Sequence, residues 1–468
     1  MISVSRSILA VVVGIFLFTM EVAAQNLRVS DNGRFLVKSD GTPFIWIGDT
    51  AWELFHRLDS AEANKYLSDR ADKGFNVIQA VVLAELDGLN TPNANGDIPL
   101  IENDPTKPNG AYFEHVDYML GIADRLDLYM AILPSWGEWV TPRFGDYIFK
   151  NTSDAYTFGN YLGQRFRGFQ NIIWVLGGDR LPDERKEGIA IWRAMAEGVT
   201  DGVNGTDRFD KEADYSTTLM TYHCFAPSSD FFREDAWIDF HSWGSYHNAN
   251  EEKRAYTIAQ EMWKDLNTPI INLEPAYEKI PKNYEPNAKA GYFDASDVRR
   301  HAYWSVFTGA FGHTYGAHPI WQMYNKDVGP RSTYTPMYWS EALNLEGAND
   351  MKHIKHLLLS RPNENRTPAL NIIKEQTEGT HHISAFKGET YAMIYIPEGN
   401  DFQVKMGFIE GAKVKAWWFN PRDGTSLYIN EYINEGEISF YPLGEPNKGN
   451  DWVLVLDNSD KEYTLPGI

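Results

Sequence analysis

The chain has 468 residues, of which 43% are hydrophobic and 23% charged, a composition typical of a folded globular protein. This length allows a large core and two or three domains. The formal net charge of −21 disfavours binding to nucleic acid or to an anionic membrane surface. Aromatic residues reach 14%, and their rings can stack on apolar sugar faces as well as fill a core.

The N-terminus carries the pattern of a secretory signal peptide over residues 1–24. Arg6 precedes an apolar run over 8–18, and Ala24 ends a small-x-small cleavage pattern. The run is too short for a transmembrane helix, and no later stretch reaches ~18 apolar residues, so we expect no membrane span. We therefore expect an exported protein, periplasmic or at the cell surface, that acts as a monomer.

Short apolar runs alternate with amphipathic helical segments through the first two thirds of the chain. The helical spacing is clearest over 60–73 and 112–126. Eight strands separated by helices predict an α/β fold, a (β/α)8 TIM barrel, over residues 25–362. The eight apolar runs are 43–48, 75–83, 128–134, 171–177, 217–223, 237–243, 269–273 and 309–315.

After Pro362 the pattern changes to short runs separated by Gly, Pro and Asp-Gly turns. This predicts a C-terminal β-sandwich over residues 363–468. A strand pair within 27–37 is expected either to precede the barrel or to pack on the sandwich. The expected sandwich strands are 382–386, 390–396, 403–408, 412–419, 426–428 and 452–456.

Acidic residues end two of the predicted barrel strands, where a barrel of this type builds its site. Asp179 follows the fourth strand in GGDR, and Glu274 ends the seventh in NLEPAY. Glycosidic cleavage uses one carboxylic acid to protonate the leaving oxygen and one carboxylate at the anomeric carbon. We predict Asp179 as general acid/base and Glu274 as nucleophile of a retaining reaction, with carboxyl groups ~5–5.5 Å apart. Either acid alone could instead be a structural cap or salt bridge.

Other residues near the strand ends are candidates for contacts with a sugar. Asp49 and Glu85 suit either hydrogen bonds to substrate hydroxyls or internal hydrogen bonds. Trp52, Trp136 and Trp243 suit the core, although one or two of them are expected to form a stacking platform. The residues expected to bind substrate are Asp49, Trp52, Glu85, Trp136, Arg180, His223, His241, Trp243, His313 and Tyr315.

Several histidines in this region raise the question of a metal. Their spacing matches no HxH or HExxH pattern on one element, so we expect no metal and no other cofactor. Hydrogen bonds to sugar hydroxyls or to a carboxylate are the expected roles. The only cysteine, Cys224, follows His223 directly, and adjacent strand residues face opposite sides, which argues against a Cys/His nucleophile. The histidines in question are His223, His241, His247, His313 and His318.

Four segments resemble the bacterial glycoside hydrolases of family 140: FLVKSDGTPFIWIGDTAWELFHRL, IIWVLGGDR, INLEPAYE and AWWFNPRDG. The resemblance covers nearly the whole mature chain and implies a barrel followed by a domain whose family name refers to collagen binding. We do not expect collagen binding. The resemblance also implies an apiosidase, which hydrolyses the bond between D-apiose and galacturonic acid in pectic rhamnogalacturonan II. The acids of the matching motifs are Asp179 and Glu274.

A galacturonate-containing substrate needs local cations, because the chain as a whole is acidic. Arg143, Arg180, Lys279 and Lys282 follow strand ends and could bind such carboxylates, with surface solubility as the alternative. Two other functions remain open: a glycosidase acting on another plant polysaccharide, and a noncatalytic glycan-binding surface protein. An open pocket that both strand-end acids share and that Trp residues line would favour an enzyme.

Overall fold

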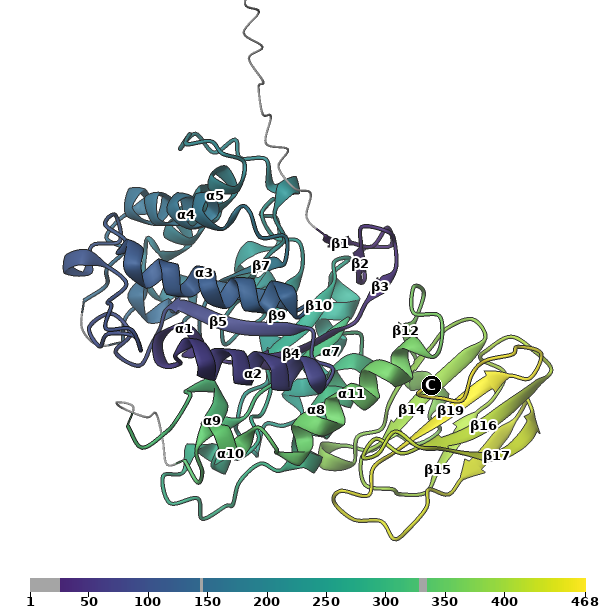
Figure 1. The fold of residues 1–468 in the computed structure, drawn as a ribbon. Coiled ribbons are helices and arrows are strands. Elements are labelled where there is room, and N and C mark those ends of the chain that lie inside the picture. The colour runs from purple at the N-terminus through teal and green to yellow at the C-terminus, as the bar shows by residue number, and fades with distance from the viewer. Residues whose placement is uncertain (1–25, 144–145, 328–334) are drawn as a thin grey trace, which may run out of the picture.

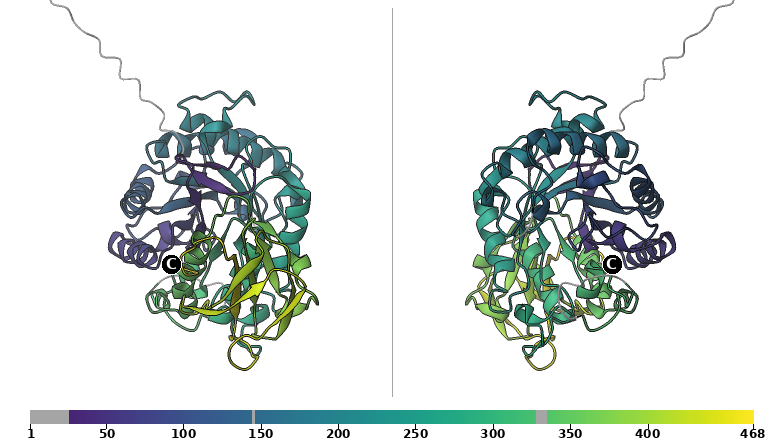
Figure 2. Two further views of the ribbon diagram at one scale, coloured as in Figure 1. Left: turned by 90° about the vertical axis from the view of Figure 1, so that its right-hand side faces the viewer. Right: turned by 90° about the vertical axis from the view of Figure 1, so that its left-hand side faces the viewer.

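The computed structural model describes residues 26–143, 146–327 and 335–468. These residues form an eight-stranded barrel surrounded by helices and a C-terminal β-rich part (Figure 1). Figure 2 shows the helices as a ring around the strands, with the β-rich part packed against one side. The predicted signal peptide lies outside the described residues.

The barrel is a ring of parallel strands in the order β8-β7-β6-β5-β4-β11-β10-β9. Side chains join the two ends of this order: Thr221 Oγ1 donates to the Phe240 carbonyl (2.6 Å), and Ser242 Oγ donates to the Tyr222 carbonyl (2.5 Å). Each strand overlaps one of the eight predicted runs, so the predicted TIM barrel is confirmed. The strands are β4 (Trp46–Thr50), β5 (Val77–Leu83), β6 (Tyr129–Ser135), β7 (Ile172–Gly177), β8 (Met220–His223), β9 (His241–Gly244), β10 (Ile270–Glu274) and β11 (Gly312–Tyr315).

Helices cover the outside of the barrel. Helix α2 begins at the predicted Ser60, because the Asp59 carboxylate accepts hydrogen bonds from the Ala61 and Glu62 backbone amides. The longer helices are α2 (Ser60–Asp72), α3 (Gly110–Arg125), α4 (Thr152–Phe166), α5 (Gly188–Val203), α7 (Arg254–Asp265), α8 (Ala295–Phe307) and α11 (Glu346–Leu359). The short ones are α1 (Leu54–Arg57), α6 (Ser229–Phe232), α9 (His318–Trp321) and α10 (Trp339–Ala342).

A small antiparallel sheet precedes the barrel and packs on it. Leu27, Leu36 and Phe44 belong to the same buried apolar cluster as the barrel interior. Phe44 contacts the ring of Tyr129, the first residue of β6, with centroids 5.1 Å apart. The sheet therefore covers the N-terminal ends of the barrel strands. Its strands are β1 (Leu27–Val29), β2 (Leu36–Lys38) and β3 (Pro43–Phe44).

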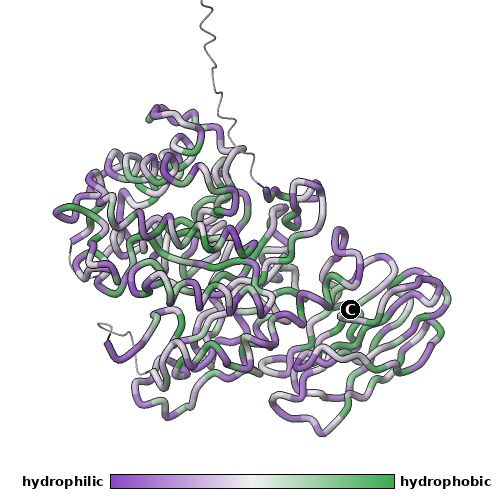
Figure 3. The backbone as a smooth tube through the Cα atoms, viewed as in Figure 1, coloured by the Kyte–Doolittle hydropathy of each residue, from purple (hydrophilic) through white to green (hydrophobic). Residues whose placement is uncertain are grey.

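The C-terminal part contains a six-stranded antiparallel sheet and a two-stranded one, in the orders β12-β13-β14-β19-β16-β17 and β15-β18. Ile394, Val404, Trp418 and Phe440 share the apolar core between the two sheets. Figure 3 shows apolar residues recurring along these strands and along those of the barrel. The strands are β12 (Thr367–Pro368), β13 (Ser384–Lys387), β14 (Tyr391–Ile396), β15 (Phe402–Lys405), β16 (Lys413–Phe419), β17 (Ser426–Ile433), β18 (Glu437–Phe440) and β19 (Trp452–Asn458), of which β12 and β18 were not expected.

Buried contacts fix the β-rich part to helix α8. The Tyr303 ring stacks on the Tyr395 ring at a centroid distance of 4.7 Å. Arg299 of α8 donates to both carboxylate oxygens of Asp451, at 3.0 and 2.8 Å, and to Asp350 at 2.7 Å. Packing and buried ion pairs therefore hold the two parts together. In the described ranges, no helix has the length and apolar character needed to cross a bilayer.

Candidate active site

Ten side chains line a pocket at the C-terminal ends of the barrel strands. We call it the barrel pocket. It brings together five residues singled out from the sequence: Asp179, Glu274, Trp52, Glu85 and Trp136. The other lining residues are His247, Tyr277, Ile280, Tyr284 and Trp321.

A strained turn after β7 places Asp179. Gly177, Gly178 and Asp179 all have positive φ, at 92°, 133° and 55°. A Cβ on Gly177 would lie 2.3 Å from the His223 carbonyl oxygen, and one on Gly178 would lie 2.6 Å from the Trp136 ring. Only glycine therefore allows these close approaches. Left-handed backbone is concentrated at functional sites, where it orients a particular side chain. Here it orients the side chain of Asp179.

Two imidazoles hold Glu274, the last residue of β10. His247 Nε2 lies 3.2 Å from Glu274 Oε1, and His223 Nε2 lies 3.0 Å from Glu274 Oε2. The Nδ1 atom of His247 accepts the Tyr277 backbone N–H (3.2 Å), and that of His223 accepts the Asp179 backbone N–H (3.3 Å). Because Nδ1 is an acceptor in both rings, the ring proton is on Nε2, facing Glu274.

The two acids are close and their environments differ. One carboxylate oxygen of each lies within 4.8 Å of the other. Burial, followed by the negative charges of Glu274 and Glu85, raises the pKa of Asp179 well above its usual value. Burial also opposes ionisation of Glu274, but the close approach of His223 and the hydrogen bond from His247 outweigh it and hold its pKa below the usual range. The two environments therefore favour the protonated form of Asp179 and the ionised form of Glu274.

The same place could accept a divalent cation. Asp179, His223 and Glu274 each offer one ligand atom, and these atoms lie within 4.8 Å of one another. Oxygen and imidazole nitrogen are ligands that zinc accepts. A metal held there would occupy both acids, so the site can serve either a metal or the proton chemistry of two carboxyl groups.

Asp49 and Tyr315, both expected to bind substrate, do not line the barrel pocket. Asp49 accepts hydrogen bonds from the Tyr66 hydroxyl (2.8 Å) and from Arg70 Nε (2.5 Å) of helix α2. The Tyr315 hydroxyl donates to Glu278 Oε2 (2.7 Å). Successive residues of a strand face opposite sides of the sheet. A polar residue near a strand end can therefore face the helices instead of the pocket.

His241, Trp243 and His313 also lie outside the pocket lining. His241 Nδ1 lies 2.9 Å from Ser228 Oγ, and Trp243 packs in an apolar cluster with residues of α7. His313 is buried, and within the described residues neither ring nitrogen has a hydrogen-bond partner. Burial, then the charge of His301, lowers the pKa of His313 to about 3, so this ring is neutral. His223, by contrast, contacts Glu274 directly.

Of the four candidate cations, Arg143 is the one placed near the acids. Its charge lowers the pKa of Asp179, against the larger raising effect of burial. Arg180 instead supports a loop: its Nε donates to the Thr141 carbonyl (3.0 Å), and it pairs with Glu184. Lys282 lies 3.4 Å from Asp297. Lys279 lines a different pocket.

Sequence reasoning missed the residues that approach from beyond the strand ends. Tyr277 follows Glu274 in NLEPAY, and Trp321 ends the short helix α9. His247, which follows β9, was by contrast among the histidines expected to hydrogen-bond a sugar hydroxyl or a carboxylate. Ile280 and Tyr284 come from the loop after β10. Proximity in sequence to a strand end marks His247 and Tyr277 as candidates, but no pattern predicts how far the loops fold back over the barrel.

Comparison with known proteins identifies the class and the family. A family model described as "Apiosidase-like, catalytic domain" matches residues 30–365, and one described as "Putative collagen-binding domain of a collagenase" matches residues 367–457. No protein with a curated description matches the chain. A solved structure described as "Glycoside hydrolase" is 32% identical, with a TM-score of 0.84 over 94% of this chain and 98% of that one. A glycoside hydrolase family 5 structure from Bacteroides vulgatus ATCC 8482 is 30% identical, with a TM-score of 0.83 over 94% and 95%.

With two acids in a ring-lined pocket at the strand ends of a TIM barrel, the chain is a glycoside hydrolase. It belongs to the apiosidase-like family, since the family model covers most of its length. Its substrate is therefore a glycan, and a purely glycan-binding role is no longer needed to explain the pocket.

Proposed function

We propose that the protein is a retaining apiosidase that cleaves the bond between D-apiose and galacturonic acid in rhamnogalacturonan II. The observation that carries the mechanism is the close approach of Asp179 and Glu274, with carboxylate oxygens within 4.8 Å. Retaining glycosidases keep these groups ~5–5.5 Å apart, whereas inverting enzymes need ~6.5–9.5 Å to admit a water. The match to the apiosidase-like family and the motifs GGDR and NLEPAY support the proposed substrate.

The protonation states fit a double displacement. Asp179, whose pKa burial raises, donates a proton to the leaving glycosidic oxygen while Glu274 attacks the anomeric carbon. Asp179, now ionised, then removes a proton from a water that displaces Glu274 from the sugar. The N–H groups of His223 and His247 aim the Glu274 carboxylate and keep it ionised before attack.

Trp52, Trp136 and Trp321 supply apolar surfaces that suit the faces of sugar rings. The rings of Trp52 and Trp136 meet at 5.4 Å and 56° and so form one wall. Glu85 lies in the same pocket, where burial and neighbouring acids raise its pKa well above the usual value. A protonated Glu85 can donate a hydrogen bond to a substrate oxygen. These groups support the binding of one sugar beside the two acids.

Arg143 is our candidate for the galacturonate carboxylate, because it is exposed and its charge acts on Asp179 and Tyr284. We expect Arg143→Gln to raise KM for a galacturonate-containing substrate and to leave KM for its carboxyl-reduced analogue unchanged. Arg143→Lys, which keeps the charge, is the matched control. Equal changes of KM on both substrates would reject Arg143 as the residue that binds the galacturonate carboxylate.

Incubation with rhamnogalacturonan II and with neutral plant glycans, followed by product identification, tests the substrate. Release of D-apiose-linked side chains only from rhamnogalacturonan II is the expected result. Cleavage of a neutral glycan alone would favour the alternative, a glycosidase acting on another plant polysaccharide. The anomeric configuration of the first product, followed by NMR during early turnover, tests retention separately.

We also propose export to the periplasm by the signal peptide over residues 1–24. N-terminal sequencing of the mature protein should begin at Gln25, and fractionation should place it with periplasmic markers. An intact N-terminal Met1 in that fraction would contradict cleavage at the predicted site.

A further inference from the structure

The loop after β10 carries a tyrosine, Tyr284, that lines the barrel pocket and remains 44% exposed. The loop after β9 holds this segment in place. The Asn283 N–H donates to the His247 carbonyl (3.1 Å), and Asn283 Oδ1 accepts the Ala249 N–H (2.9 Å). The Tyr284 ring lies edge-on to the His247 ring, with centroids 5.3 Å apart at 72°. Tyr284 is therefore placed beside the imidazole that contacts Glu274.

The backbone at Tyr284 is unusual for a tyrosine. Its φ is +56° and that of Asn283 is +59°, both in the left-handed region. Asparagine tolerates this region, whereas a bulky residue rarely adopts it. Glycine would adopt it without strain. Strained residues of this kind are concentrated at functional sites, so a role for the side chain explains why a tyrosine occupies this position.

Tyr284 reaches the barrel pocket from the side opposite Trp136. Strands β6 and β10 lie four places apart in the ring of eight strands, so the residues that follow them approach from opposite sides. Trp136 follows β6 directly, and Tyr284 belongs to the loop after β10. Both line the barrel pocket together with Asp179 and Glu274. A sugar held beside the two acids therefore has Trp136 on one side and Tyr284 on the other.

The Tyr284 hydroxyl lies among the charged groups of the barrel pocket. Burial, followed by the charges of Glu274 and Asp179, raises the pKa of this hydroxyl, so it stays a donor at neutral pH. Glu85 adds to this effect, and the positive charge of Arg143 opposes it. Among the described residues, the hydroxyl has no hydrogen-bond partner. It is therefore a donor that a bound sugar can use.

We propose that Tyr284 is a substrate-binding residue: its ring packs on the sugar beside Asp179 and Glu274, and its hydroxyl donates a hydrogen bond to a sugar oxygen. The proposal rests on the proposed function in one respect, namely that the bond is cleaved between these two acids. A tyrosine with only a structural role would contribute to folding and leave turnover unchanged. A sugar contact does the reverse, because its loss lowers turnover and leaves the protein folded.

Two substitutions separate the hydroxyl from the ring. Tyr284→Phe should lower kcat/KM about fivefold, because one hydrogen bond to the substrate is lost. Tyr284→Gly removes the ring as well and should lower kcat/KM on the order of 10²-fold. The midpoint of urea unfolding of Tyr284→Gly should stay close to that of the parent, because relief of the left-handed backbone offsets the added freedom of glycine.

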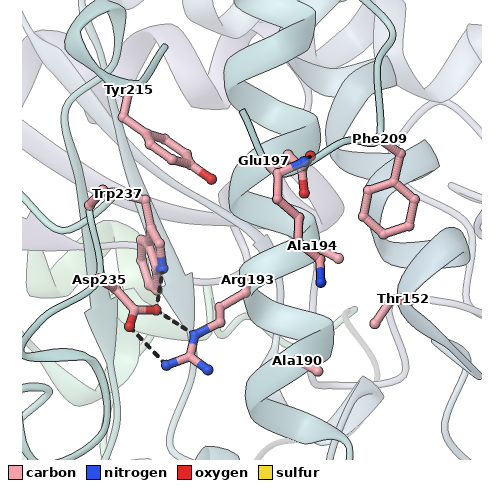
Figure 4. Close-up of a pocket in the computed structure, with 11 residues that line it drawn as sticks. Thr152, Ala190, Arg193, Ala194, Glu197, Phe209, Tyr215, Asp235 and Trp237 are labelled. Atoms are coloured by element: carbon pink, nitrogen blue, oxygen red, sulfur yellow. Dashed lines mark hydrogen bonds and ion pairs between the residues drawn. The ribbon is translucent and has the colours of Figure 1, made fainter. Parts of the chain in front are cut away.

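Two further variants are the matched controls. Ala288→Gly also replaces a left-handed residue of the same loop, at φ +48°, and should leave kcat/KM unchanged. Tyr215→Phe removes a tyrosine hydroxyl from a different pocket, beside helix α5 (Figure 4), which shares no lining residue with the barrel pocket. It should also leave kcat/KM unchanged. An equal fall in kcat/KM for Ala288→Gly and Tyr284→Gly would overturn the proposal, because loop mobility alone would then explain the loss.

The substrates are rhamnogalacturonan II and neutral plant glycans, and the variants are compared on the one that the parent cleaves. Unchanged kcat/KM in Tyr284→Gly would overturn the proposal. A lower urea midpoint with kcat/KM per folded molecule unchanged would do so as well, since it would show a structural role. A parent that cleaves only a neutral glycan rejects the proposed substrate, and the variants then test Tyr284 on that glycan. The two proposals therefore fail by different measurements.

Discussion

Two buried carboxylates of the barrel, Asp49 and Glu274, lie in different layers and have different partners. Asp49 faces helix α2, where the Arg70 guanidinium and the Tyr66 hydroxyl bind it. Glu274 faces the barrel pocket, where two imidazole N–H groups approach it and no Arg or Lys of the described residues forms an ion pair with it. The Arg70 guanidinium carries a full positive charge, and its ion pair with Asp49 gives that carboxylate a structural role. The imidazoles of His223 and His247 interact with Glu274 less strongly than a guanidinium would, so its ionised carboxylate stays available to react.

The largest expected effect is on turnover. Glu274→Gln should lower kcat on the order of 10⁴-fold or more, since it removes the attacking oxygen anion. Asp179→Asn should cost ~10²–10⁴-fold, because it removes the acid that protonates the leaving group. Thermal unfolding should show both variants folded. Near-normal turnover in either variant would reject the role of that residue.

The Asp49 ion pair should instead control stability. Asp49→Asn removes the buried carboxylate that pairs with Arg70 and leaves Asp69, at 3.0 Å, as its ionic partner; breaking a buried pair costs ~3–5 kcal/mol. Urea unfolding measures the loss, while kcat per folded molecule should stay near that of the parent. The double variant Asp49→Leu, Arg70→Met should recover part of the loss, because it removes both charges. A large fall in kcat at full folding would mean that Asp49 serves the reaction after all.

The same contrast explains what the sequence could predict. The barrel followed from alternating apolar runs, and the pair Asp179 and Glu274 followed from acids at strand ends. Asp49 and His313 also lie near strand ends, but pairing across the sheet sets which side of the strand each faces. Tyr284 and Trp321 come from segments beyond the strand ends, whose path depends on tertiary packing that no local pattern encodes.

A smaller effect is expected on the pH dependence. Activity needs Glu274 ionised, so it falls as pH drops through the lowered pKa of Glu274, and it needs Asp179 protonated, so it falls as pH rises through the raised pKa of Asp179. His247→Phe removes one hydrogen bond to a charge, worth ~1.5–3 kcal/mol, and should move the acid limb of kcat/KM upward by about one to two pH units.

His247→Gln keeps an N–H donor and is the matched control for that shift. The alkaline limb, which belongs to Asp179, should stay nearly in place in the Phe variant. An acid limb that does not move would mean that His247 only fills space beside Glu274.

The smallest effect is expected for a carboxylate paired at the surface. Asp117 accepts hydrogen bonds from Arg165 Nε (3.1 Å) and Nη2 (2.7 Å), a geometry as good as that of Asp49 with Arg70. Water reaches both side chains, so Asp117→Asn should cost less than ~1 kcal/mol in urea unfolding. Added salt should shrink this cost and leave that of Asp49→Asn nearly unchanged, because buried pairs are screened less. Equal costs at the two sites would mean that bond geometry, rather than burial, separates a structural carboxylate from an expendable one.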